Sequence, residues 1–184
     1  DVNSVSIHSV RENCAYVPQD NFLFSDTIAR NIAFGNSQVD MGMVRHAAVL
    51  ADVDENISQF QQGYETVLGE RGVTVSGGQK QRISIARALM KDAPILILDD
   101  SVSAVDTKTE RAILDNLKQT RRGKTTILIA HRISTIEQMD KVLFIDGGTV
   151  AGFGTHEALY AQNAAYRKMV DLQRLEEEGG KVNA

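Results

Sequence analysis

The stretch Pro94-Ile-Leu-Ile-Leu-Asp-Asp100 indicates the fold class of this chain. Its four consecutive apolar residues, Ile95 to Leu98, are typical of a strand that is buried on both faces of a sheet. Further strands are predicted on either side of it, at 13–17, 125–130 and 141–146. Helices are predicted between these strands, and this alternation is the signature of an α/β fold with a doubly wound sheet.

The helices are predicted from their caps and apolar spacing. They are expected at 26–34, 40–51, 54–60, 78–90, 108–119 and 164–175. The turn Asp146-Gly147-Gly148 predicts a hairpin with a strand at 149–153. Residues 1–11 contain no clear element. The segment 176–184 has too little apolar surface to pack, so we expect a disordered tail there.

Composition excludes several classes of protein. The chain has 184 residues, of which 42% are hydrophobic and 24% charged, as expected for one globular domain with at most a small appendage. No apolar run approaches the roughly 18 residues of a spanning helix, and residues 1–13 do not resemble a signal peptide. The net charge of −4 gives no general attraction to nucleic acid. A single cysteine, Cys14, excludes an internal disulfide framework and a multi-cysteine zinc site, and a reducing compartment is expected.

Two carboxylates end the predicted central strand. Asp99 and Asp100 place negative charge at the carboxyl edge of the sheet, where open α/β sheets bind ligands. Mg²⁺ prefers one or two carboxylates together with phosphates and waters, so the pair suits a magnesium site. The alternative is that both aspartates are solvated loop residues that cap the next turn.

Two other segments carry groups that suit an anion. His131 directly follows the predicted strand at 125–130 and can donate a hydrogen bond to a phosphate oxygen; alternatively, it is a structural histidine. The run Ser76-Gly-Gly-Gln79 opens a helix and presents free backbone N–H groups at the positive end of the helix dipole. The alternative for this run is an ordinary cap and linker.

The order and spacing of these features resemble the nucleotide-binding domain of an ATP-binding-cassette (ABC) transporter. Tyr16-Val-Pro-Gln19-Asp resembles the Q-loop of that family, and Val-Ser-Gly-Gly-Gln79 resembles its signature motif. Ile95 to Asp99 resembles the Walker B strand. Ser103-Ala-Val-Asp106 resembles the D-loop, and His131 the H-switch. The resemblance covers residues from about 10 to 175.

The resemblance implies that the chain uses ATP and Mg²⁺. It assigns Mg²⁺ to Gln19 and Asp99, and catalysis to Asp100 and His131. The residues implied in ATP binding are Gln19, Ser76, Gly77, Gly78, Gln79 and Asp106. The implied fold is a P-loop NTPase-like (RecA-like) parallel-sheet core, here incomplete, with an α-helical signature subdomain. Four divisions are expected. Residues 1–19 are the end of the first core part with the Q-loop, and 20–92 are the helical subdomain. Residues 93–175 are the second half of the core, and 176–184 are the tail.

Two segments, at 22–34 and 66–72, resemble the exporter branch of the family. In that branch the ATPase usually follows a membrane domain on the same polypeptide, and a loop that here carries Glu70 contacts that membrane domain. The alternative for Glu70 is an exposed charge pair with Arg71, which is worth little in stability. The implied partners are a transmembrane domain and a second nucleotide-binding domain arranged head to tail. The implied location is the cytoplasmic face of the cell membrane, with the 184 residues themselves soluble.

The P-loop pattern Gly-x-x-x-x-Gly-Lys-[Ser/Thr] is missing from these 184 residues. The tripeptide Gly-Lys-Thr occurs at 123–125, but Lys118 stands where the first glycine is required, and the tripeptide opens a strand rather than a helix. We therefore interpret it as a turn. The chain is expected to represent the C-terminal part of a nucleotide-binding domain and to be inactive by itself.

Asp100 is a second departure, because the family normally has a glutamate as its catalytic base. Aspartate is one methylene shorter, whereas a general base must lie within about 2.6–3.2 Å of the attacking water. A misplacement of ~1 Å can cost on the order of 100-fold in rate. In exporters built from two different halves, the half with aspartate often contributes an impaired site, so a heterodimeric exporter is implied.

Three functions compete on this evidence. The first is the ATPase domain of a heterodimeric exporter, and the second is a regulatory half that occludes nucleotide and hydrolyses little. The third is a soluble ATPase of the translation or DNA-repair kind. The exporter-like segment at 66–72 and the acidic composition argue against this third function and against a nucleic-acid partner.

Overall fold

The computed structural model describes residues 1–36, 39–69 and 74–182, with side chains up to Glu176. The chain forms two compact units, Asp1–Ile129 and Ala130–Ala184, which are described separately here.

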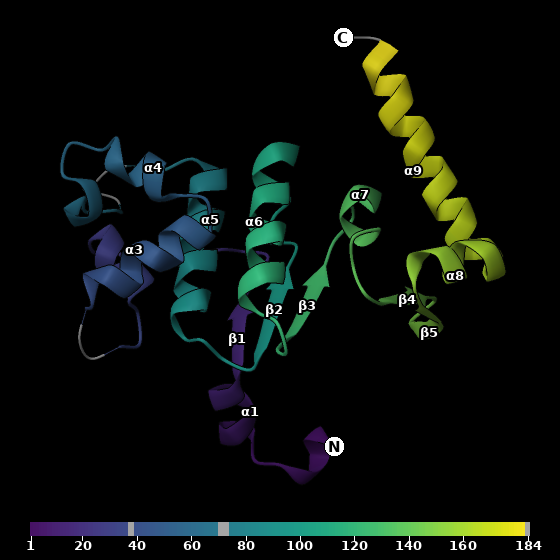
Figure 1. The fold of residues 1–184 in the computed structure, drawn as a ribbon, viewed down its shortest axis with the longest axis horizontal. Coiled ribbons are helices and arrows are strands. Elements are labelled where there is room, and N and C mark those ends of the chain that lie inside the picture. Colours follow the sequence, from purple (N-terminus) through teal and green to yellow (C-terminus); the bar gives the residue numbers. More distant parts are fainter. Residues whose placement is uncertain (37–38, 70–73, 183–184) are drawn as a thin grey trace. The chain divides into compact units, whose positions relative to one another are not determined.

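A three-stranded parallel sheet forms the centre of the first unit. Its strands are β1 (Cys14–Val17), β2 (Ile95–Asp99) and β3 (Thr125–Ile129), in the order β1-β2-β3. All three arrows point the same way in Figure 1. Val17, the last residue of β1, is paired with Leu98, whereas Asp99 is paired with Ile129 of β3. The parallel sheet predicted from the sequence is confirmed.

Helix α1 (Ile7–Asn13) precedes β1, and other helices lie between the strands. These are α2 (Ile28–Ile32), α3 (Met41–Leu50), α4 (Asp54–Ser58), α5 (Gly77–Met90) and α6 (Thr107–Thr120). The 3₁₀ turns are at Val2–Ser4 and Gly63–Glu65. Side-chain oxygens of the N-cap residues accept backbone N–H groups at α2, α3, α5 and α6. At α2 the cap is Thr27, so this helix begins later than the start at 26 that the sequence predicted. Helix α1 was not predicted, because none of its residues is buried and it therefore carries no apolar stripe.

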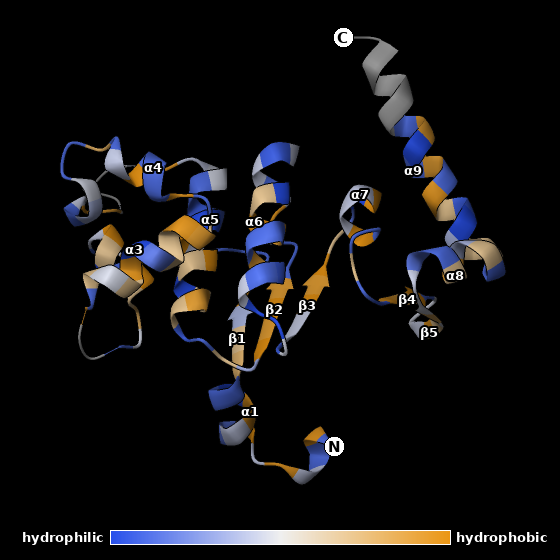
Figure 2. Ribbon diagram, viewed as in Figure 1, coloured by the Kyte–Doolittle hydropathy of each residue, from blue (hydrophilic) through white to orange (hydrophobic). Residues whose placement is uncertain are grey.

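The core of the first unit lies on one face of the sheet. Leu96 and Leu98 of β2 are fully buried, and α5 packs Ile83 and Ile85 into the same cluster. Alternate residues of β2 are only half-buried, and in β3, coloured largely as hydrophobic in Figure 2, Ile127 is 47% exposed. The expectation of burial on both faces is therefore wrong for the described residues. A continuous apolar run is compatible with either arrangement, since it marks no polar face.

In the part of the chain that the structure describes, the second unit consists of a hairpin and three helices. It contains α7 (Ile133–Ile136), β4 (Val142–Asp146), β5 (Thr149–Gly154), α8 (His156–Gln162) and α9 (Ala164–Val182). Strands β4 and β5 pair antiparallel, with Asp146 opposite Thr149. Gly147 and Gly148 both have positive φ, 54° and 75°, as a two-residue hairpin turn requires. This confirms the predicted hairpin. A small core joins the elements through Ile133, Val142, Leu159, Tyr166 and Val170.

The structure differs from the prediction at the end of the chain. Helix α9 continues to Val182, whereas the sequence predicted a disordered tail from Glu176. The three glutamates that begin this segment are good helix formers, although Gly179 and Gly180 after them are not, and a helix satisfies its backbone internally even where no apolar surface is available for packing. The polar composition of this segment therefore argued against packing and not against a helix. Within the described residues, no helix is both long and apolar enough to cross a membrane.

Candidate functional site

The carboxyl ends of β1 and β2 bring three predicted site residues together. Gln19 follows β1 after Pro18, and its Nε2 donates to Oδ2 of Asp100 at 3.5 Å. Asp99 is the last residue of β2, and its Oδ2 accepts a hydrogen bond of 3.0 Å from the hydroxyl of Tyr16. The structure thus joins the predicted Q-loop by side-chain contacts to Asp99, which ends the predicted Walker B strand, and to Asp100, which follows it.

Tyr16 was not singled out as a site residue by the sequence. In β1 its neighbours Ala15 and Val17 are buried, while Tyr16 is 55% exposed, so its side chain lies on the open face of the sheet. The hydrogen bond from Tyr16 to Asp99, with smaller effects of burial and of the aspartate's charge, raises the pKa of the phenol. The period-two alternation of the strand was the signal that could have pointed to it.

Asp100 has a left-handed backbone, with φ of 46°. Aspartate tolerates this region better than most residues because its side chain is short and polar. The amide of Asp100 donates to the carbonyl of Ile129 at 3.1 Å, and its own carbonyl accepts the hydroxyl of Ser103 at 2.8 Å. The chain therefore leaves the sheet in a tight turn at the residue assigned as the catalytic base.

Gln81 of α5 ties this turn to the helix. Its Oε1 accepts the amide of Ala104 at 3.0 Å, and its Nε2 lies 3.4 Å from both the carbonyl of Asp100 and the hydroxyl of Ser103. Gln81 is buried. Sequence reasoning missed it, because a glutamine that bridges segments more than 15 residues apart has no local signature.

The predicted signature motif forms the start of α5. Oγ of Ser76 accepts the amide of Gln79 at 3.2 Å, while Oε1 of Gln79 accepts the amide of Ser76 at 2.9 Å, which is a capping box. A Cβ at Gly78 would lie 3.0 Å from the carbonyl oxygen of Ala104, so the helix start packs against the predicted D-loop. At Gly77 the nearest atom is 4.0 Å away. In this structure Ser76 and Gln79 thus have the capping role that the sequence left open; ATP binding by this motif stays a prediction.

Asp106 caps α6. Its Oδ1 accepts the amides of Lys108 and Thr109 at 3.1 and 3.0 Å. The bond from the Thr109 backbone, followed by weaker contacts in the same turn, lowers the pKa of the carboxyl group. As with Ser76, the observed role is structural, and the predicted contact with ATP is untested.

His131 belongs to the second unit, two residues after the end of β3, and is exposed. Its carbonyl oxygen accepts a hydrogen bond from Nε2 of Gln173 on α9. Glu70, the predicted contact with a membrane domain, lies outside the described residues.

The donor set at the strand ends fits a magnesium ion. Asp99 and Asp100 provide carboxylate oxygens and Gln19 an amide oxygen, which are the hard donors that Mg²⁺ prefers. The described residues hold no group of three or more acidic, histidine or cysteine side chains that would form a complete metal cage. This is compatible with Mg²⁺, which takes its remaining ligands from phosphates and waters.

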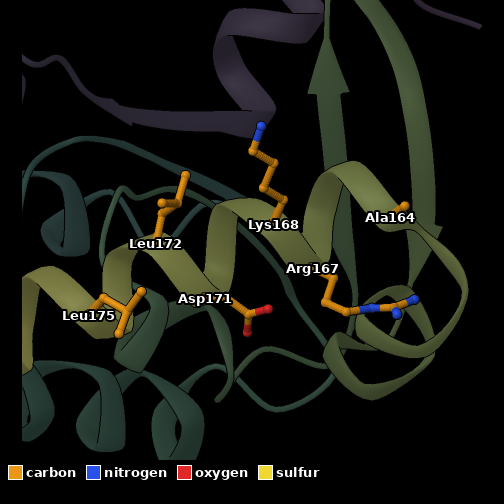
Figure 3. Close-up of a pocket in the computed structure, with 6 residues that line it drawn as sticks. All are labelled: Ala164, Arg167, Lys168, Asp171, Leu172 and Leu175. Carbon is orange, nitrogen blue, oxygen red and sulfur yellow. The ribbon is translucent and has the colours of Figure 1, made fainter.

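The second unit also has a shallow pocket of about 270 Å³ on α9 (Figure 3). It is lined by Ala164, Arg167, Lys168, Asp171, Leu172 and Leu175. None of the predicted site residues lines it.

The comparisons with known proteins agree with this geometry. The family described as "ABC transporter" matches residues 1–103. The chain belongs to the ABC transporter family.

The similar proteins include a probable multidrug transporter and a lipid flippase. The chain is 46% identical over 181 residues to the probable multidrug resistance ABC transporter ATP-binding/permease protein YheI of Bacillus subtilis. It is 45% identical over 178 residues to the ATP-dependent lipid A-core flippase of Chromohalobacter salexigens. Each alignment covers 97% of this chain and 31% of the relative, so the chain spans about a third of these proteins.

A solved structure has the same fold. It is described as a bacterial Atm1-family ABC exporter with ATP bound, and it matches with a TM-score of 0.89 and 42% identity. The match covers 95% of this chain and 31% of that chain. The P-loop NTPase-like fold predicted from the sequence is confirmed.

Proposed function

We propose that this chain supplies part of the ATP-binding and ATP-hydrolysing domain of an ABC exporter. The observation that carries the proposal is the contact set at the ends of β1 and β2, where Gln19 reaches Asp100 and Tyr16 reaches Asp99. Two carboxylates and an amide converge where an open α/β sheet binds its ligand. Gln81, two residues after the predicted signature motif, binds both this turn and the predicted D-loop.

Each residue has a distinct role in this proposal. Asp99 and Gln19 hold Mg²⁺, which neutralises charge on the phosphate oxygens. Asp100 orients and deprotonates the attacking water, and His131 donates a hydrogen bond to the terminal phosphate. The N–H groups of Gly77 and Gly78 at the start of α5, with Ser76, Gln79 and Asp106 beside them, serve the nucleotide of a partner domain.

The partners follow from the same assignment. A second nucleotide-binding domain, arranged head to tail, completes each ATP site. A transmembrane domain is coupled to ATP binding and hydrolysis through the segment that contains Glu70. The name of YheI pairs ATP binding with a permease, which supports a membrane domain as the partner. The location that this arrangement implies is the cytoplasmic face of a cell membrane.

The test uses the full-length transporter that contains this chain, purified in lipid. Asp99→Asn should abolish Mg²⁺-dependent ATP hydrolysis at this site while ATP binding without Mg²⁺ remains. Asp115→Asn, which changes an exposed aspartate on α6, is the matched control and should behave as the wild type. If Asp99→Asn hydrolyses ATP with the wild-type Mg²⁺ requirement, the assignment of the strand ends as the ATP site is wrong.

A second candidate function is a regulatory half that occludes nucleotide without turning it over. It is favoured by Asp100, whose side chain is shorter than the family's glutamate. Trapping experiments with labelled ATP distinguish the two functions. A regulatory half retains intact ATP through many turnovers of its partner, whereas an active half releases ADP.

A further inference from the structure

The side-chain amide of Gln173 on α9 binds the backbone on both sides of Arg132. Its Oε1 accepts the amide of Ile133 at 3.1 Å, and its Nε2 donates to the carbonyl of His131. The oxygen and the nitrogen of one side-chain amide thus bind two backbone groups that belong to residues two positions apart. This contact lies wholly within the second unit.

The contact replaces a missing helix cap. Helix α7 has only four residues, and its N-cap residue, Arg132, makes no side-chain cap hydrogen bond. The amide of Ile133 is the first N–H of α7 and has no partner within the helix. The oxygen of Gln173 satisfies it from another helix, so the backbone that leads out of His131 is fixed by α9.

Helix α9 is itself firmly held in this unit. Tyr166 and Val170 are fully buried, and the hydroxyl of Tyr166 lies 2.8 Å from Nδ1 of His156. One residue after Gln173, Nη2 of Arg174 lies 2.6 Å from Oε1 of Glu137, the C-cap residue of α7. The two ends of α7 are therefore both attached to neighbouring residues of α9.

We propose that Gln173 is a positioning residue for ATP hydrolysis, which acts by holding the backbone of His131 and so the direction of its imidazole. The inference rests on the proposed function, because it assumes that His131 contacts the nucleotide. The stretch of α9 that carries Gln173 thereby belongs to the catalytic arrangement, although its side chain touches no reacting atom. A displacement of ~1 Å at a catalytic group is enough to cost on the order of 100-fold in rate.

Glutamine is specific in this role. Glutamate of the same shape keeps the acceptor for Ile133, but its second oxygen would face the carbonyl oxygen of His131 and repel it, because a carboxylate only accepts hydrogen bonds. Leucine of similar size loses both hydrogen bonds without this repulsion. Gln173→Glu and Gln173→Leu therefore remove the contact to His131 in two different ways.

The test measures kcat and KM for ATP in the full-length transporter. We expect kcat to fall about 10-fold or more for Gln173→Leu and at least as far for Gln173→Glu, with KM for ATP within about twofold of the wild type. Gln138→Leu is the matched control. It also removes a glutamine bond to a backbone carbonyl, that of Ser134, but leaves the His131 segment untouched, so kcat should not change.

A double-variant cycle separates positioning from a general structural effect. If Gln173 acts through His131, Gln173→Leu should cause no further loss in a His131→Ala background, measured by single-turnover hydrolysis. An equal loss in both backgrounds, or an unchanged kcat for Gln173→Leu, overturns the proposal. Failure of the proposed function gives a different result. If His131→Ala itself hydrolyses ATP at the wild-type rate, His131 has no role in hydrolysis, and both the proposed function of His131 and this inference are wrong.

Discussion

The phenol of Tyr16 donates a hydrogen bond to Oδ2 of Asp99, with 3.0 Å between the two oxygens. The last backbone pair between β1 and β2 is Val17 with Leu98, one residue before Asp99. The side chain of Tyr16 therefore links the two strands beyond their last backbone pair. On the open face of the sheet, Tyr16 therefore holds the carboxylate that is assigned to Mg²⁺, and a carboxylate oxygen retains lone pairs for a metal while accepting one bond.

Tyr16→Phe should weaken Mg²⁺ binding in the full-length transporter. Loss of a hydrogen bond to a metal-ligating side chain typically costs 10–100-fold in affinity, and we expect a value near the lower end, roughly 10-fold, because Tyr16 is exposed. Electron paramagnetic resonance of Mn²⁺ in the presence of ATP measures the affinity. Tyr160→Phe, which removes a similar bond of 2.7 Å to Asp171, is the control. Equal Mn²⁺ affinity in both variants contradicts the role of Tyr16.

Asp100→Glu should raise ATP hydrolysis by this half when the partner's own glutamate is disabled. The longer side chain restores reach to the attacking water and keeps the charge. The gain is limited by the backbone, because φ of 46° favours aspartate over glutamate. Asp100→Asn, which suits this backbone but cannot act as a base, should remain at background. If the glutamate variant also stays at background while it binds ATP normally, reach is not the limiting defect.

His131→Ala should reduce turnover but leave the melting temperature nearly unchanged, because His131 is exposed. His156→Ala is the structural comparison, since His156 is buried and bonded to the hydroxyl of Tyr166. A buried hydroxyl without a partner costs about 1–3 kcal/mol, and each kcal/mol lowers the melting temperature of a chain of this size by roughly 2–4 °C. A drop of many degrees for His131→Ala would instead indicate a structural histidine.

Gly78→Ala should destabilise the 184-residue chain, because its Cβ would lie 3.0 Å from the backbone carbonyl of Ala104. Gly77→Ala is the matched control, since the nearest atom there is 4.0 Å away. In a helix, alanine is better than glycine by about 1 kcal/mol, so the control should be neutral or stabilising. Urea unfolding of both variants gives the comparison, and equal free energies of unfolding would show that the contact with Ala104 is easily relieved.

Asp106→Asn should flatten the acid side of the stability profile. The cap lowers the pKa of Asp106 in the folded chain, so its contribution is present above the unfolded pKa and is lost as the pH falls below about 4. Asparagine caps equally well but does not titrate there. The free energy of unfolding should therefore fall less between pH 5 and pH 3 in this variant than in the wild type. Asp115→Asn, in the middle of the same helix, should retain the wild-type profile.

The parts of the fold that could be predicted are those with local signals. The apolar run before Asp99 marks a strand, the glycines at 147 and 148 mark a turn, and the serine and glutamine of the signature motif mark a helix start. Local patterns alone did not decide whether these residues bind a ligand or cap a helix. Their ligand-binding roles were predicted from the resemblance to a family.

The parts that could not be predicted depend on contacts between distant segments. Gln81 and Gln173 each use both ends of an amide on backbone groups of another element, and glutamine at these positions looks like any exposed helix residue. The alternation of its strand could have placed Tyr16 on the open face, but not its contact with Asp99, because this partner lies 83 residues away. The extension of α9 beyond Glu176 was missed for another reason. Apolar patterns in a sequence indicate packing, and a helix can form without packing.

The three hydrogen bonds of Gln81 have a consequence for local opening. The amide of Ala104 is bonded to a side chain of α5 rather than to its own loop, so it can exchange with solvent only when that side chain is released. Hydrogen–deuterium exchange at Ala104 should therefore follow the exchange of the first turns of α5. The turn after Asp99 and the start of that helix then form one cooperative unit, which opens or stays closed as a whole.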